Sequence, residues 1–341
     1  MRSRAVVSAT PVRIGVSSCL LGNAVRYDGG HKRDAWLVDT LGRYVEWVPV
    51  CPEVEIGLGT PRPTLRLEGR GDHLRLMMPS TGGDYTDAMR QYAQARVAAL
   101  ARRKLCGYVL KKNSPSCGMQ RVKVYGAKTK PRRIGRGLFA DALLGRLPNL
   151  PVEEEGRLND PTIRGHFIAR VFAYHRVRTL FAARWTPRDL IAFHSAHRLQ
   201  LMVHAPARYR ALDQLVANAK TLSRTLVRTR YEADFMRALA VRATTARHAN
   251  MLRHLVDQFG SELNPIARRT LLRVIDDYSR ALISLVVPLT LIRDYIRQFG
   301  VTSLSAQTYL APHPIELLHE VAGAPQTGDA RGLARKAGFE P

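Results

Sequence analysis

The feature that most constrains the fold is that three cysteines each follow closely on a short apolar run. The pairs are Cys19 after Val12–Ser17, Cys51 after Tyr44–Val50 and Cys117 after Gly107–Leu110. Short apolar runs that alternate with helical patterns predict a parallel α/β sheet. Ligands of such sheets bind beyond the carboxyl ends of the strands, so a common sheet would bring these three thiols to one rim. Cys106 precedes its run and is expected at the opposite rim or in the core.

The clearest helix signal in the first half begins at Thr86. This residue can cap the helix, and Asp87 suits the positive end of the helix dipole. The apolar stripe has helical spacing and consists of Met89, Tyr92, Ala93, Val97 and Leu100. Further along, Leu147–Pro161 is typical of an acidic connector bounded by prolines. We therefore expect residues 11–165 to form an α/β domain with a parallel sheet.

The second half has a different character, because helix follows helix from Thr186 to about Gly300. Thr186 and Asp189 form a start signal of the capping-box type, with Pro187 at the first helical position. We expect residues 186–320 to form an all-α domain that follows the α/β domain. The tail at residues 321–341 is rich in Gly, Ala and Arg and is expected to be mobile.

The charge balance is the unusual part of the composition, since 53 basic and 28 acidic residues give a formal net charge of +25. Such a surplus favours a polyanionic partner, most often a nucleic acid, although an arginine-rich proteome would produce a similar bias. One candidate for phosphate contacts is the basic hairpin segment Gln120–Arg136, which contains Lys123. A second basic surface is expected if Asp213–Arg230 is one helix, whose face would then carry Lys220, Arg224 and Arg228.

Two features of the sequence indicate where the protein resides. The most apolar run, Ala281–Ile292, is too short to span a bilayer, and the basic start of the chain lacks the long apolar stretch of a signal peptide. Four cysteines in 341 residues do not make a disulfide framework. We therefore expect a cytoplasmic protein with reduced thiols, no membrane association and no evident protein partner.

Three distant thiolates at one rim suit two kinds of metal site. The chain has no Cys-x-x-Cys motif, which argues against a zinc ribbon or a ferredoxin-type run. The alternatives are a zinc ion with histidine or water as the fourth ligand, and a [4Fe–4S] cluster with one iron free of protein ligands. An open iron is a Lewis acid suited to a sulfur atom of the substrate. A third interpretation is three small buried side chains without any ligand.

The polar residues beside these cysteines have both a chemical and a structural interpretation. Glu53 could move protons to or from water, or accept backbone N–H groups at the next turn. Ser114 and Ser116 could donate hydrogen bonds to a substrate or to cluster sulfur, or could cap the turn around Cys117. Asp28 could orient water or a base, although Asp-Gly is mostly a turn signature.

Three ordered segments of the first half resemble the thiouracil desulfurase family: VSSCLLGNAVRYDGGHKRD, VPVCPEVEIGLGTPRP and YVLKKNSPSCG. The second half, from AFHSAHRLQLMVHAPARYRAL to AQTYLAPHP, resembles a helical domain of unknown function that is often fused to it. The pair is similar to two-domain bacterial desulfidases that convert 4-thiouridine in tRNA to uridine. The resemblance implies that Cys19, Cys51 and Cys117 bind a [4Fe–4S] cluster. It also implies catalytic roles for Glu53 and Ser114.

The implied reaction is non-redox: the fourth iron binds the thiocarbonyl sulfur, water attacks the base carbon and sulfide leaves. Asp28, Ser116 and the basic residues named above are assigned to substrate binding. One departure from the family is Gly165-His166, where a Glu-Asn pair is usual. Our first hypothesis is desulfuration of 4-thiouridine in tRNA. The alternatives are desulfuration of free thiouracil or thionucleosides, and a nucleic-acid-binding protein with a structural metal or cluster.

Overall fold

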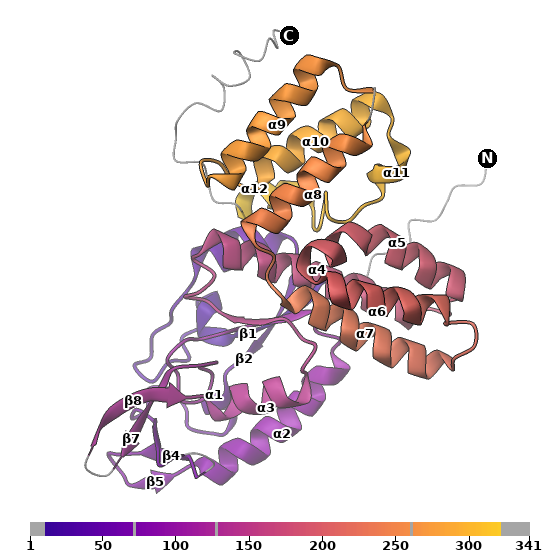
Figure 1. The fold of residues 1–341 in the computed structure, drawn as a ribbon. Helices are drawn as coiled ribbons and strands as arrows, with labels where there is room; N and C mark the ends of the chain where they lie inside the picture. The colour runs from indigo at the N-terminus through magenta and orange to yellow at the C-terminus, as the bar shows by residue number, and fades with distance from the viewer. Residues whose placement is uncertain (1–10, 71–72, 127–128, 260–261, 322–341) are drawn as a thin grey trace, which may run out of the picture. The chain divides into compact units, whose positions relative to one another are not determined.

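The computed structural model describes residues 11–70, 73–126, 129–259 and 262–321 (Figure 1). It divides into two compact units, Met1–Arg242 and Ala243–Pro341, and we describe each by itself. The first unit holds the α/β part together with four long helices. The expected all-α range 186–320 therefore runs across this division. The tail expected to be mobile lies, apart from Val321, outside the described residues.

The first sheet is parallel throughout, which confirms the predicted fold class for the N-terminal region. Its strands, in the order β2-β1-β6-β9, are β2 (Glu46–Val50), β1 (Arg13–Ser17), β6 (Gly107–Leu110) and β9 (Val152–Glu154). The prediction of a connector at Leu147–Pro161 was wrong, because this segment contains the edge strand β9. The carboxylates of Glu153, Glu154 and Glu155 are mostly buried there.

A close contact fixes the register of β1 against β6. Gly15 lies opposite Tyr108 in the parallel ladder, and the Tyr108 ring occupies the space that a Cβ atom of residue 15 would need. Any larger residue at this position would displace the fully buried ring. The contact holds the two strands level, so their carboxyl ends meet at one edge of the sheet. β2 pairs with β1 in parallel and ends at the same edge.

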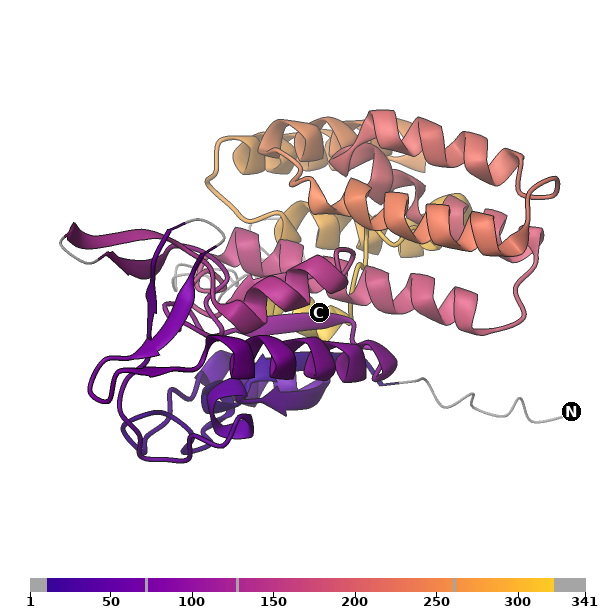
Figure 2. The ribbon, with the colours of Figure 1, turned by 90° about the horizontal axis from the view of Figure 1, so that it is seen from below.

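The second sheet is mixed and contains the basic hairpin. Its strands, in order, are β5 (Gly83–Asp84), β4 (Arg75–Met78), β3 (Arg66–Glu68), β7 (Val122–Gly126) and β8 (Thr129–Gly135). β7 and β8 pair in antiparallel fashion, as predicted for the segment Gln120–Arg136. Buried Val122 and Val124 attach the hairpin to the core, and β8 is the edge strand. The hairpin lies at the margin of the first unit in both views (Figures 1 and 2).

Short helical turns follow the strands, and two longer helices pack together beside the sheet. The turns are η1 (Ser18–Leu21), η2 (Trp36–Thr40), η3 (Leu41–Arg43) and α1 (Pro52–Glu55). The longer helices α2 (Thr86–Arg102) and α3 (Leu138–Arg146) lie side by side (Figure 2). The prediction that Thr86 caps α2 was wrong. Its hydroxyl instead donates to Asp84 at 2.5 Å and accepts from the backbone of Leu76 at 2.8 Å.

Four helices complete the first unit: α4 (Pro161–Ala182), α5 (Pro187–His204), α6 (Pro206–Ala217) and α7 (Arg224–Ala240). The predicted capping box of α5 is present, with the Thr186 hydroxyl and the Asp189 carboxylate each bonded to the backbone of the other residue. The prediction of one helix over Asp213–Arg230 was wrong. The Ser223 side chain accepts from Leu226 and starts a new helix, so Lys220 lies in the preceding turn.

The second unit is helical, as predicted for the C-terminal region. Its helices are α8 (Thr245–Gln258), α9 (Pro265–Ser279), α10 (Val286–Phe299), α11 (Thr302–Ser305) and α12 (Ile315–Val321). Asn264 caps α9, and Gly300 ends α10 in the left-handed conformation with φ 65°. None of the helices in the described part of the chain has the length and apolar character needed to cross a membrane.

Candidate functional site

A cavity of about 390 Å³ opens at the carboxyl ends of β1, β2 and β6. Each of the three strands contributes the residues that follow it directly. β1 leads into Ser17–Cys19, β2 leads into Cys51–Glu53, and β6 leads into the segment Lys111–Pro115 and Cys117. The segments 25–27 and 64–65, together with Lys32 and Arg62, form the rest of the wall. This is the edge at which parallel sheets bind ligands.

The structure brings Cys19, Cys51 and Cys117 together as lining residues of this one cavity. Cys106 lies elsewhere, at the start of β6, where its sulfur is 3.7 Å from the Nδ1 atom of His175. All four cysteines are free thiols. The cysteines therefore divide into three and one, in the grouping that strand position predicted.

Burial makes the three cavity thiols difficult to ionise. Loss of solvent is the largest cause for each, and it raises the pKa of Cys19 to about 11. The pKa of Cys51 is raised and that of Cys117 is raised well above its ordinary value, again mainly by burial. Negative charge on Cys51 or on Cys19 raises the pKa of Cys117 further and so opposes its ionisation. A positively charged group in the cavity would favour the thiolates that metal binding requires.

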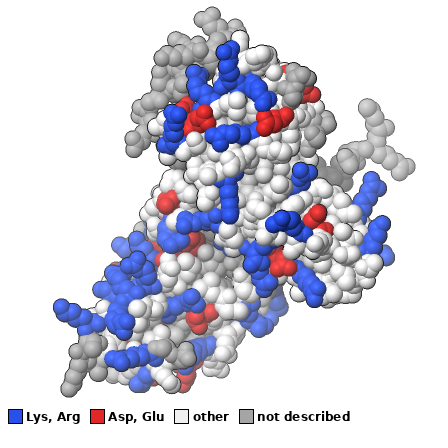
Figure 3. All heavy atoms as spheres, in the orientation of Figure 1, with Lys and Arg blue, Asp and Glu red and all other residues white. Residues whose placement is uncertain are grey.

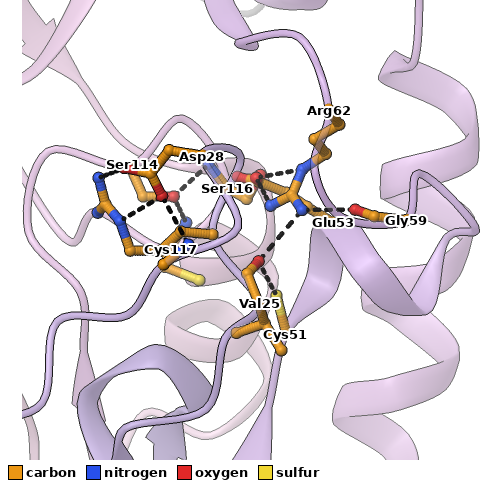
Figure 4. Close-up of polar contacts among 11 residues, drawn as sticks. Val25, Asp28, Cys51, Glu53, Gly59, Arg62, Ser114, Ser116 and Cys117 are labelled. Carbon is orange, nitrogen blue, oxygen red and sulfur yellow. Dashed lines mark hydrogen bonds and ion pairs between the residues drawn. The ribbon is translucent and has the colours of Figure 1, made fainter.

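Glu53 is the central hydrogen-bond acceptor of the site (Figure 4). Its Oε2 atom accepts from Nη2 and Nε of Arg62, at 2.5 and 3.2 Å. Its Oε1 atom accepts from the Ser116 hydroxyl at 2.9 Å. A carboxylate held by a guanidinium fork and a hydroxyl has a fixed orientation toward the cavity that it lines.

Arg62 is the functional candidate that the sequence reasoning missed. Its side chain is 3% exposed, and its Nη1 atom also donates to the carbonyl oxygens of Val25 at 3.1 Å and Gly59 at 2.7 Å. The Val25 carbonyl accepts in addition from the Cys51 thiol, at 3.7 Å. Arg62 thus links three segments of the cavity wall. The only signal in the sequence was an arginine between two prolines, Pro61 and Pro63, a few residues after Glu53.

The two serines of the Cys117 turn have different positions. Ser114 lines the cavity, and its Oγ atom accepts from the backbone N–H groups of Ser116 at 3.2 Å and Cys117 at 3.0 Å. It therefore caps the turn, while its own hydroxyl proton stays available for another acceptor. Ser116 is fully buried and donates to Glu53.

The residues assigned to substrate binding are dispersed. Asp28 is exposed and accepts from the Arg26 guanidinium and from the backbone of Gly30, which lowers its pKa. It completes a turn whose neighbours Arg26 and Tyr27 line the cavity. Lys123 is exposed on β7. Arg224 and Arg228 lie on α7, where the Arg224 guanidinium is 5.7 Å from the centre of the Trp185 ring. The basic stripe Lys220, Arg224 and Arg228 does not lie on one helix.

Comparison with known proteins identifies both halves of the chain. Residues 14–155 match the family model of 2-thiouracil desulfurase, and residues 198–314 match that of a protein family of unknown function, DUF1722. The chain is 32% identical over 154 residues to the uncharacterized protein YbbK of Bacillus subtilis (strain 168), which covers 42% of this chain and 97% of that protein. It is 28% identical over 166 residues to the uncharacterized protein YbgA of Escherichia coli (strain K12), covering 48% of this chain and 95% of that protein.

One solved structure is also similar, that of the [4Fe-4S]-dependent thiouracil desulfidase TudS. The two share 34% sequence identity, and the match covers 43% of this chain and 93% of that one, with a TM-score of 0.36.

Proposed function

The chain belongs to the 2-thiouracil desulfurase family, and from that premise we propose that it converts 4-thiouridine in tRNA to uridine with release of sulfide. The observation that carries this proposal is the cavity at the strand ends, where three free thiols and an oriented carboxylate face one space. The reaction balances without electrons. Water supplies the oxygen of the new carbonyl and two protons, and sulfur leaves as hydrogen sulfide.

Cys19, Cys51 and Cys117 would hold a [4Fe–4S] cluster. Within the described residues, no three His, Cys, Asp or Glu side chains converge closely enough to hold a single metal ion. The described residues that line the cavity include three free thiols and no histidine, and this all-sulfur set of soft donors fits an iron–sulfur cluster. When bound, the cluster would supply an iron without a protein ligand, which acts as a Lewis acid toward a soft sulfur atom.

The chain's own residues would manage water and protons. Two donors of Arg62 occupy the Oε2 atom of Glu53, so Oε1 is the oxygen that accepts a proton from the attacking water. The Ser116 hydroxyl already bonds to Oε1 and holds it in place. Ser114 would donate its free hydroxyl proton to the substrate. Buried Arg62 keeps the carboxylate group from rotating as the proton moves.

A substrate within RNA is supported by charge. A neutral free base does not require a protein with a formal net charge of +25, whereas the phosphates of RNA are neutralised by Lys and Arg. Binding through such contacts weakens as the salt concentration rises, in proportion to the number of phosphates contacted. A base stacked within folded RNA would have to leave the stack to enter the cavity. The helical half would then contribute to binding the rest of the tRNA.

A second candidate is desulfuration of free thiouracil, which the name of the family favours. This reaction needs the same cavity and the same cluster. It requires no phosphate contacts.

One experiment separates the two candidates. Cluster-loaded protein is incubated without oxygen with tRNA that contains 4-thiouridine and, separately, with 2-thiouracil. We expect nucleoside analysis to show loss of 4-thiouridine with an equal amount of uridine and sulfide. Turnover of 2-thiouracil with the tRNA unchanged would establish the second candidate. Loaded protein that releases sulfide from neither substrate would refute the desulfidase proposal.

A further inference from the structure

We propose that the β7–β8 hairpin and the adjoining cavity rim form one continuous surface for the phosphodiester backbone of RNA, which guides a nucleotide of that RNA into the cavity. The inference rests on the proposed function and names the part of the protein that distinguishes RNA from a free base. It comes from three observations: unpaired charge on the hairpin, like charges facing each other across its strands, and a direct bond from the hairpin to the rim.

The first observation is that the hairpin cations have no acidic partners. Four side chains are exposed there and form no ion pair with any carboxylate of the described residues: Lys123, Lys130, Arg132 and Arg133. Elsewhere on the first unit, exposed arginines are often paired, as Arg75 is with Asp84 at 2.6 Å. Figure 3 shows Lys and Arg side chains gathered over the hairpin, with few acidic ones among them. A surface of this kind fits a polyanion.

The second observation is that Lys123 and Arg133 are direct partners in the antiparallel ladder. Side chains at directly opposite positions leave the same face of a sheet, and like charges in this arrangement destabilise the pair. A phosphate group between or beside them would remove the repulsion. The two like charges therefore do not stabilise the hairpin itself, which favours a role in binding an anion.

The third observation connects the hairpin to the cavity. The Nη1 atom of Arg133 donates to the Oδ1 atom of Asn113 at 3.1 Å, and Asn113 lines the cavity. Its neighbour Lys112 lines the cavity as well, as does exposed Lys32. Positive charge thus continues from the exposed strands to the cavity mouth.

An aromatic side chain at the mouth supports the same ligand. Tyr27 is 42% exposed although it lines the cavity, and the Arg26 guanidinium lies 5.2 Å from the centre of its ring. An exposed ring beside a cation is a platform on which RNA-binding proteins stack an unpaired base. The backbone carbonyl of Tyr27 accepts from the backbone of Arg62 at 2.8 Å, which fixes the platform to the site. We expect the base next to the thiolated nucleotide to stack on the Tyr27 ring.

The test compares two variants with equal loss of charge. The hairpin variant is K123Q/K130Q/R132Q/R133Q, whose substitutions leave the buried Val122 and Val124 unchanged. The control is R43Q/R102Q/R103Q/R146Q, which changes four exposed arginines of the first unit that lie outside both the cavity lining and the helical half. Both are measured as full chains, with circular dichroism and thermal melting as a check on folding.

Binding is measured first, on the cluster-free protein, by fluorescence anisotropy with labelled tRNA at several salt concentrations. We expect the hairpin variant to bind at least tenfold more weakly, and its slope of log affinity against log salt to be smaller by about 3. The control should bind within about threefold of the unchanged protein. On loaded protein, the ratio of kcat/KM for thiolated tRNA to kcat/KM for 2-thiouracil should fall at least tenfold in the hairpin variant, through KM.

Three outcomes would overturn or separate the proposals. Unchanged tRNA binding by the hairpin variant would overturn the inference, and so would an equal loss in the control, because net charge alone would then explain the effect. If the hairpin variant loses binding but the unchanged loaded protein releases no sulfide from any substrate, the RNA surface stands and the proposed reaction fails.

Discussion

Two regions of the first unit gather ionisable side chains, and they differ in what these side chains contact. One is the cavity at the strand ends. The other is a layer of histidines, here called the histidine layer, between α4, α5 and α7. Each of its imidazoles faces an oxygen of the fold within 3.0 Å: His166 with Leu239 O, His194 with the Tyr231 hydroxyl, His197 with Phe193 O and His204 with Val241 O.

The histidine layer uses one ring nitrogen of each imidazole in such a contact within the fold. Ring stacking adds to this, with His197 on Phe193 at 4.0 Å and His194 on Tyr209 at 5.3 Å. The cavity thiols line an open space instead, where Cys51 also donates to the carbonyl of Val25 at 3.7 Å, and the carboxylate beside them is held in place by other residues. A cluster of reactive residue types therefore indicates a site only where the fold leaves their atoms available. The departure at His166 from the family pattern belongs to the histidine layer.

Removal of a cavity thiol is the change that we expect to affect iron content and activity most. We expect Cys19→Ala, Cys51→Ala or Cys117→Ala each to reduce bound iron and to lower activity to background. Iron and sulfide analysis with the visible absorption spectrum measures the cluster. Cys106→Ala is the matched control, because its thiol lies beside His175 and should leave iron content and activity unchanged. Full iron content in the three cavity variants would show that these thiols are not the ligands.

The next effect is that of the carboxylate. Glu53→Gln keeps the shape and the bond from Ser116 but removes the proton acceptor, so we expect kcat to fall about 100-fold with the cluster retained. Glu68→Gln is the control, since that carboxylate lies on β3 and accepts from Arg66, outside the cavity lining. Undiminished turnover by the Glu53 variant would remove this residue from the mechanism.

A smaller effect is expected at Arg62. Arg62→Met removes the four hydrogen bonds of a buried guanidinium, and we expect it to destabilise the protein by about 2–3 kcal/mol and to lower kcat about 10-fold. Arg62→Lys keeps the charge but loses the planar fork, so it should restore part of the stability and less of kcat. Urea unfolding of the cluster-free protein and steady-state kinetics measure the two. If Arg62→Lys restored stability and kcat to the same extent, the positive charge of Arg62 would matter and its planar geometry would not.

Much of the fold at the cavity follows from local sequence pattern. Ile14 and Val16 alternate with small residues in β1, and both are fully buried. Parallel pairing then requires that the segments after β1, β2 and β6 meet, whatever their sequence separation. The strand β9 escaped prediction because three consecutive glutamates are typical of a solvated connector. Their carboxylates instead have partners within the fold: Glu155 pairs with Lys111, Glu154 accepts from the backbone of Met119, and Glu153 pairs with nearby Arg157.

The site shows the same limit. The position of the three cysteines could be predicted, because each follows its own strand. The pairing of Glu53 with Arg62 and Ser116 could not, since it depends on where the loop of residues 56–65 folds back. The basic stripe failed for a local reason, because the Ser223 cap divides the expected helix before Arg224. Strand order is encoded locally, whereas side-chain partners across loops depend on the assembled structure.

The smallest expected effect on activity concerns His197, in the histidine layer. Burial, and then the charge of Arg176, lower its pKa from 6.5 to about 3. The unfolded state therefore binds more protons between these values, so the stability that the neutral ring provides is complete above pH 6.5 and is lost as the pH falls toward 3.

His197→Gln keeps an oxygen that can accept from Arg176, whose Nε donates to the ring at 3.1 Å. Between pH 6.5 and 5 the unfolding free energy of the variant should fall by about 2 kcal/mol less than that of the unchanged protein. Urea unfolding at several pH values measures this difference. Activity at pH 7.5 should stay within about twofold, because the ring's polar atoms contact only the fold. A loss of turnover as large as that of Glu53→Gln would place the histidine layer in the reaction and remove the contrast between the two regions.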